Sequence, residues 1–145
     1  MTQDRSTTDG LPIPQGLYVP AVRCGHMIFT AGMTPRQNGI LQFQGIIEAN
    51  ADPATHAEAV ILSCSNALAA AEAQLVAGEK LAAIVSLTVY IATVPGFMAH
   101  SKLADYASQF LKDRLGEAAI GCRAAIGVAS LPGNAPVEIQ LIASV

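Results

Sequence analysis

Short runs of apolar and β-branched residues near the start of the chain predict strands. Residues 18–23 and 26–31 are two such runs, and Cys24-Gly25 between them predicts a hairpin. The turn signal Asn38-Gly39 precedes a further short strand at 40–43. The first part of the chain is therefore expected to be β-structure.

In the middle of the chain the apolar residues recur at every third or fourth position instead. This period predicts an amphipathic helix over 53–77, with Asp52 as its N-cap and Gly78 as its stop signal. Residues 97–115 repeat the helical spacing and are followed by Gly116, so they predict a second helix.

Three further strands are expected around the second helix. Residues 83–92 are dense in β-branched and apolar residues, which is typical of a buried strand. Residues 123–130 and 137–144 read as two strands, and the Pro- and Gly-bearing segment 131–136 between them predicts a closing hairpin. The resulting order, β-β-β-α-β-α-β-β, predicts an α+β domain with a mixed sheet and both helices on one face.

The register of this closing hairpin predicts a pocket wall. With the turn centred between Gly133 and Asn134, the face opposite the core carries Arg123, Ala125 and Glu138. An arginine among small side chains suits a planar carboxylate, and a solvated arginine on an exposed face is the alternative. Glu138 is either a structural hydrogen-bonding partner or a group that orients a water molecule. The register places Arg123 and Glu138 about 20 Å apart, so they would share a pocket where two subunits meet.

The composition bounds the class of protein. Of the 145 residues, 52% are hydrophobic and 13% are charged, which indicates that further copies of the chain cover some apolar surface. The net charge of −3 and the absence of a basic stripe argue against nucleic acid as a partner. The polar start and the interrupted apolar stretches predict no signal peptide and no membrane span, with the cytoplasm as the expected location. We expect a flexible tail at 1–10 and a single domain at 11–145.

Cysteine and histidine residues are dispersed along the chain. Cys24, Cys64 and Cys122 are widely spaced and are expected to be buried thiols, with Cys122 pointing toward the core. Neither a disulfide framework nor a metal site is expected. Nucleotide-binding motifs and nucleophilic triads do not occur either.

Three sequence blocks resemble the RidA/YjgF family, which is also called the endoribonuclease L-PSP family. They are GLYVPAV at 16–22, GHMIFTAG at 25–32 and CRAAIGVASLPGNAPVEI at 122–139. The resemblance covers nearly all of the chain from residue 11 onward, and the VPGF segment with its extended second helix indicates a divergent branch. It implies a chorismate-mutase-like fold, a homotrimer with a central barrel and ligand sites between subunits.

The resemblance also implies roles for particular residues. Arg123 matches the arginine that holds the substrate carboxylate, and Glu138 matches the acidic residue associated with the attacking water. Tyr18 matches the tyrosine that lines the cleft, and Gly32 matches the glycine whose backbone meets the ligand.

Four positions depart from the family pattern. Ala31 and Met33 replace the usual serine and glutamine on either side of the glycine, and Ala125 replaces a cysteine. The asparagine of the second helix has Ser101 as its nearest counterpart. Loss of a donor to a buried partner costs about 1–3 kcal/mol, so these changes put the identity of the substrate in question while leaving carboxylate capture intact.

The leading functional hypothesis implied by the resemblance is hydrolysis of reactive 2-imino acids or enamines to 2-keto acids and ammonia. A non-catalytic module that binds small carboxylates is the alternative, which the apolar replacements favour. RNA cleavage follows from the family's older name, and the acidic charge balance counts against it. The expected partners are a small carboxylate-bearing substrate and further copies of the chain.

Overall fold

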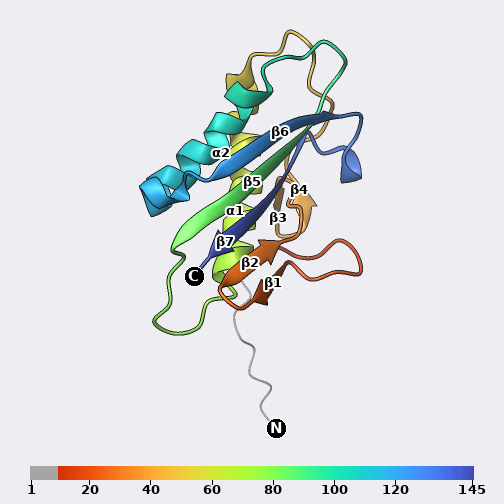
Figure 1. Cartoon of the computed structure of the whole chain (residues 1–145). Helices are drawn as coiled ribbons and strands as arrows, with labels where there is room; N and C mark the ends of the chain where they lie inside the picture. The colour runs from red at the N-terminus through yellow and green to blue at the C-terminus, as the bar shows by residue number, and fades with distance from the viewer. Residues whose placement is uncertain (1–9) are drawn as a thin grey trace.

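The computed structural model describes residues 10–145, so the tail expected at 1–10 falls almost wholly outside the described part. Two helices cover one face of a five-stranded sheet (Figure 1). Only the β5–β6 pair is parallel, which makes the sheet mixed, as predicted. The strands lie in the order β1 (Ala21–Cys24), β2 (Met27–Thr30), β7 (Val137–Ser144), β5 (Ala83–Ala92), β6 (Cys122–Val128).

Both predicted helices are present, with shorter bounds than the sequence indicated. The first begins as a 3-10 turn, η1 (Pro53–His56), and continues as α1 (Ala57–Glu72). The carboxylate of Asp52 accepts a hydrogen bond from the Ala54 amide at 3.0 Å, which confirms the predicted N-cap. The second helix, α2 (His100–Leu115), ends at Gly116 as predicted, where φ is 82°.

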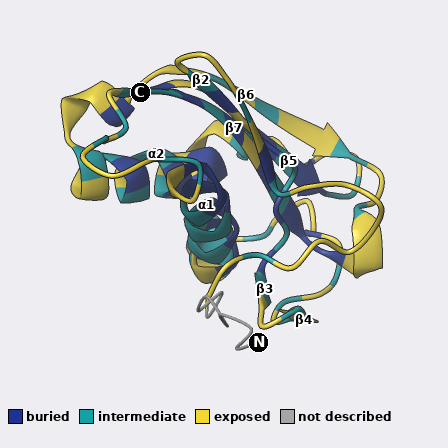
Figure 2. Cartoon of the chain, turned by 90° about the horizontal axis from the view of Figure 1, so that it is seen from below, coloured by how far each residue is buried: buried dark blue, intermediate teal, exposed yellow. Residues whose placement is uncertain are grey.

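The hydrophobic core lies between the helices and the sheet. Figure 2 shows buried residues on the inner sides of both helices and exposed residues on the outer surface of β6. Small residues on α1 allow that helix to approach the sheet closely. The core residues contributed by β5 and β7 are Leu87, Val89, Ile91, Val137, Ile139 and Leu141, and those contributed by the helices include Val60, Cys64, Ala67, Ala71, Leu103, Ala107 and Leu111.

The predicted closing hairpin is wrong. Strand β5 lies between β6 and β7, parallel to β6 and antiparallel to β7. The connection at 129–136 contains a 3-10 turn, η3 (Pro132–Asn134), and passes the end of β5, where the Ala92 amide donates to the Pro136 carbonyl at 2.9 Å. The most apolar strand thus has a neighbour on each edge, an arrangement that local turn signals do not reveal.

This topology changes which residues share a face. Arg123 is in register with buried Leu87, whereas Glu138 is in register with Tyr90, one of the residues on the uncovered face. Because neighbouring side chains at one register position point the same way, Arg123 and Glu138 lie on opposite faces. The prediction that they share a face is therefore wrong.

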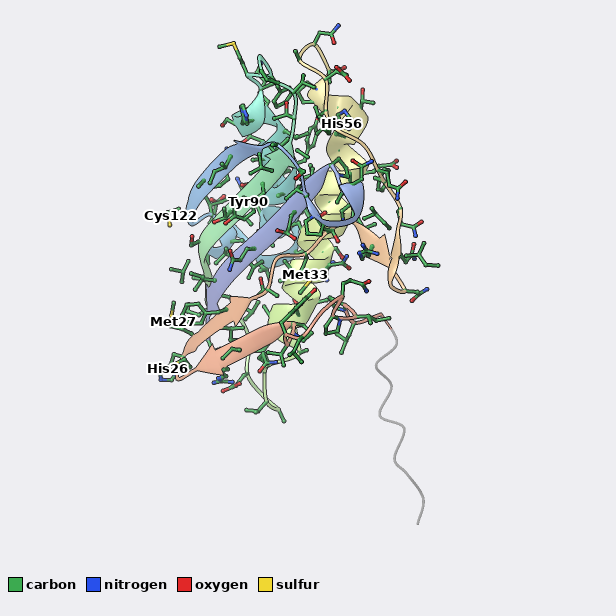
Figure 3. The ribbon with its side chains drawn as sticks, turned by 90° about the vertical axis from the view of Figure 1, so that its right-hand side faces the viewer. His26, Met27, Met33, His56, Tyr90 and Cys122 are labelled. Atoms are coloured by element: carbon green, nitrogen blue, oxygen red, sulfur yellow. The ribbon has the colours of Figure 1, made fainter. Side chains whose placement is uncertain are left out.

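The uncovered face of the sheet carries apolar side chains. Val22 is 54% exposed, Phe29 41% and Ile126 42%. Figure 3 shows Met27, Tyr90 and Cys122 on this side, away from α1. Cys122 is exposed, so the prediction that it points into the core is wrong for the same reason of register.

The other two cysteines divide between surface and core. Cys24 is exposed, whereas Cys64 on α1 is buried, as expected. The prediction of buried thiols therefore holds for one cysteine of the three.

A small second sheet completes the fold. Its strands, β3 (Arg36–Gln37) and β4 (Ile40–Leu41), are joined by the predicted turn, in which Asn38 and Gly39 have φ values of 52° and 79°. Within residues 10–145, no helix has both the length and the apolar character needed to cross a membrane.

Candidate functional site

Two segments of the chain meet beside Glu138. After β2 the chain runs along β7, where Met33 and Ile139 exchange backbone hydrogen bonds of 2.7 and 2.8 Å. The residue before this pairing, Gly32, lies against the side chain of Glu138. A Cβ on Gly32 would lie 2.7 Å from Cδ of Glu138 and 2.8 Å from its Oε2, so the absence of a side chain at Gly32 allows the carboxyl to occupy this position.

Glu138 is the candidate acid–base group of this site. Its half-buried side chain lines a cavity of about 400 Å³ together with Tyr18, Ala31 and Gly32. Burial raises the pKa of the Glu138 carboxyl above its usual value. None of residues 10–145 forms a hydrogen bond to the carboxylate, so both of its oxygens remain available to a ligand or a water molecule. A carboxyl group in this state is suited to proton transfer.

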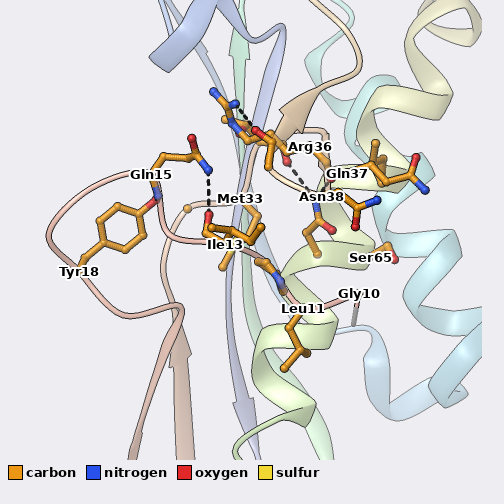
Figure 4. A pocket seen from close by; sticks show the side chains of 16 residues that line it. Gly10, Leu11, Ile13, Gln15, Tyr18, Met33, Arg36, Gln37, Asn38 and Ser65 are labelled. Atoms are coloured by element: carbon orange, nitrogen blue, oxygen red, sulfur yellow. Dashed lines mark hydrogen bonds between the residues drawn. The ribbon is translucent and has the colours of Figure 1, made fainter. Parts of the chain in front are cut away.

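Tyr18 forms an outer wall of the cavity. Its phenolic oxygen accepts a hydrogen bond from the backbone amide of Gln15 at 3.0 Å, and Tyr18 is 47% exposed. The space continues past Tyr18 into an adjoining cavity of about 290 Å³. Figure 4 looks into this second cavity, with Gln15 and Tyr18 on one side and Asn38 and Ser65 on the other.

Arg123 lies at a different place, on the edge strand β6 and on the face toward α2. Its Nη1 donates to Asp105 Oδ1 at 2.8 Å and to Ser108 Oγ at 3.0 Å. Its Nη2 donates to Ser101 Oγ at 2.9 Å and to the Ser101 carbonyl at 3.3 Å. Asp105 is 68% exposed, whereas the Arg123 side chain is 21% exposed at the rim of an open cleft between α2 and β6.

The structure thus divides the predicted site residues into two groups. Tyr18, Ala31, Gly32 and Glu138 line one cavity. Arg123 and Ser101 are in contact on the other face of the sheet, and Ala125 lies two residues farther along the same strand face as Arg123.

The register gives the separation of the two groups. Glu138 and Arg123 are three positions apart along the strands and two strands apart across the sheet. These steps amount to roughly 10 Å in each direction, so one chain does not place both side chains in one cavity. This separation is shorter than the sequence register predicted. As predicted, however, the two residues of one chain do not form a single pocket.

Sequence reasoning missed four residues that line the Glu138 cavity. Gln15, Thr34, Arg36 and Pro132 all contribute to its wall. Arg36 stands two residues before the Asn38-Gly39 turn, and this position gave no indication that the side chain would be partly buried. The signal was absent because the burial arises from the packing of β3 and β4 onto distant parts of the chain.

The described residues do not suggest a metal centre. Within residues 10–145, no group of three or more His, Cys, Asp or Glu side chains is placed to hold a metal ion.

Comparisons with known proteins identify the family. The Endoribonuclease L-PSP family model matches residues 10–145. The chain belongs to this family, the YjgF/RidA family. Among curated proteins, none matches it. The family and the chorismate-mutase-like α+β fold expected from the sequence are thus confirmed.

Several solved structures resemble this chain. Protein Atu1372 from Agrobacterium tumefaciens, described as having unknown function, is 33% identical over 93% of this chain and 85% of that chain, with a TM-score of 0.83. A putative endoribonuclease from Shewanella oneidensis is 26% identical over 93% and 89%, with a TM-score of 0.84. E. coli TdcF with bound serine is 28% identical over 95% of both chains, with a TM-score of 0.69.

Proposed function

We propose that this L-PSP family member hydrolyses reactive 2-imino acids, or their enamine tautomers, to 2-keto acids and ammonia without a cofactor. The observation that carries the proposal is the Glu138 carboxyl, which is half-buried, accepts no hydrogen bond from residues 10–145 and lies against Gly32 in a cavity of about 400 Å³. Serine bound to E. coli TdcF supports a small ligand with a carboxylate group.

The chemistry needs orientation and proton transfer more than strong activation. Water adds to the C=N carbon, and Glu138 takes a proton from that water and passes it to the nitrogen. Glu138 then takes the proton of the hydroxyl group in the tetrahedral intermediate and passes it to the amine, which leaves as ammonia as the C=O bond forms, so atoms and charge balance. The substrate carboxylate replaces the exposed Asp105 carboxylate on the Arg123 guanidinium, whose paired donors then fix the position of the C=N bond.

We further propose that the working site is formed between protomers of a homotrimer. Glu138 and Arg123 lie on opposite faces of one sheet, so a site that uses both requires a second chain. The apolar open face, with Val22, Phe29 and Ile126 exposed, supports association through the sheet. Light scattering should then give three times the chain mass of 15.0 kDa.

A non-catalytic carboxylate-binding protein is the second candidate. Ala31 and Ala125 provide no side-chain hydrogen bonds at positions near the two groups of site residues, which favours binding without turnover. Such a protein would hold keto acids and leave the rate of imine hydrolysis unchanged.

One assay separates the two candidates. A dehydratase generates 2-aminoacrylate in situ, and the loss of this enamine is followed with and without the protein. We expect acceleration by the wild-type chain, a large loss in Arg123→Ala and Glu138→Gln, and no loss in Arg114→Ala, whose guanidinium lies over the Phe110 ring. Equal acceleration by all four proteins, or none by the wild type, would contradict the enzymatic proposal.

A further inference from the structure

Arg36 carries a positive charge that no described residue neutralises. The side chain is partly buried, its Nη1 donates to the Gly39 carbonyl at 3.0 Å, and its buried Nε has no hydrogen-bond partner within residues 10–145. None of these residues provides an acidic group within ion-pair distance of Arg36, whereas Arg123 is paired with Asp105. A partly buried cation without a counter-charge is unfavourable, so an anion that reaches it is stabilised.

The position of Arg36 is fixed by its surroundings. The side-chain amide of Asn66 on α1 donates to the carbonyls of Thr34 and Arg36 at 3.1 and 2.8 Å, which holds this segment against the helix. The guanidinium also occupies space left by Gly133, where a Cβ would lie 2.8 Å from Nη2. Asn66 and Gly133, from two distant parts of the chain, therefore fix the position of the Arg36 guanidinium.

Arg36 lines the same cavity of about 400 Å³ as Glu138. It also lines the adjoining cavity shown in Figure 4, so it lies where the two spaces meet. Gln15 and Thr34 add polar groups to the shared wall. This volume is within the range of pockets that bind small molecules.

We propose that Arg36 binds a second acidic group of the ligand, so that the preferred substrate is a 2-imino dicarboxylic acid. This inference rests on the proposed function, in which Arg123 of a neighbouring protomer holds the first carboxylate. Two guanidinium groups then match two carboxylates, and Glu138 stays free for proton transfer. A monocarboxylic ligand leaves the charge on Arg36 without a partner.

A matched pair of keto acids tests this inference by calorimetry. 2-Oxoglutarate and 2-oxopentanoate have the same carbon chain and differ in whether it ends in a carboxylate or a methyl group. A charge-assisted, bidentate contact corresponds to a preference of about 10- to 100-fold, and we expect the wild type to bind 2-oxoglutarate more tightly by that factor. Arg36→Met should remove the preference and leave the affinity for 2-oxopentanoate unchanged, and Arg36→Lys should retain part of it.

Other outcomes overturn the inference. The wild-type comparison needs no variant, so equal affinity for the two acids, or binding of neither, contradicts it even if Arg36→Met fails to fold. If Arg36→Met lowers the affinity for both acids by the same factor, Arg36 holds the first carboxylate or acts structurally, and the inference is wrong. The aminoacrylate assay judges the proposed activity separately, because a protein without turnover can still prefer the dicarboxylate.

Discussion

Substitution of Gly32 by alanine tests the geometry of the Glu138 cavity directly. The new Cβ would lie 2.7 Å from Cδ of Glu138, whereas ordinary contact begins at 3.4 Å, so the carboxyl must move by about 0.7 Å, the difference of these distances. A misplacement of about 1 Å can lower a rate by about 100-fold. We therefore expect kcat/KM for imine hydrolysis to fall by between about 10- and 100-fold in Gly32→Ala.

The fold should survive this change, because the atoms that must move belong to the end of a flexible side chain. We expect the free energy of unfolding to change by less than about 1 kcal/mol, as measured by denaturant titration. Gly127→Ala is a matched control. Its Cβ would lie 2.7 Å from His100 Nε2, so it creates a similar clash without touching Glu138.

A double-mutant cycle completes the test. If Gly32→Ala acts by displacing Glu138, the substitution should have little further effect in a Glu138→Gln background. A wild-type rate in Gly32→Ala, or the same loss of rate in both backgrounds, would refute the reasoning.

Three further predictions concern stability. Burial raises the pKa of Glu138 in the folded protein, so this carboxyl contributes most favourably to folding below about pH 4.5, its ordinary pKa, and contributes less as pH rises. Thermal unfolding should therefore show Glu138→Gln gaining stability over the wild type between pH 4 and 8. The Arg23 guanidinium lowers the pKa of Glu79 to about 2, so this pair stabilises the fold above about pH 4.5 and loses its effect as pH falls toward 2; Glu79→Gln should be less stable than the wild type at pH 7 and equal to it near pH 2. Gly121→Ala would place a Cβ 2.1 Å from the Ile84 carbonyl oxygen, and because backbone cannot move aside, we expect a loss of about 1–3 kcal/mol in denaturant titration; no loss would contradict this packing.

The elements of the fold followed from local patterns. The strand at 83–92 and the turn at Asn38-Gly39 were predicted with the bounds or geometry that the structure has. Each depends on neighbouring residues, through β-branched density in one case and positive φ in the other.

The pairing of the strands did not follow from local patterns. The segment at 131–136 has the composition of a hairpin turn, yet β6 and β7 are separated by β5. A turn signal gives no information about a strand that arrives from 40 or so residues earlier in the chain, and this strand decides which face Arg123 occupies. The same limit explains why Arg36 was missed, since Asn66 and Gly133 reach it from distant elements.

The account depends on a site shared between protomers, with Glu138 from one chain and Arg123 from another. Mixed assemblies of two inactive variants, Glu138→Gln and Arg123→Ala, test this most directly. Co-expression with different tags and isolation of the mixed trimers should restore activity to about a third of the wild-type value, because one of the three sites in each mixed trimer joins an intact Glu138 to an intact Arg123. Mixed assemblies that remain as inactive as either parent would contradict a shared site.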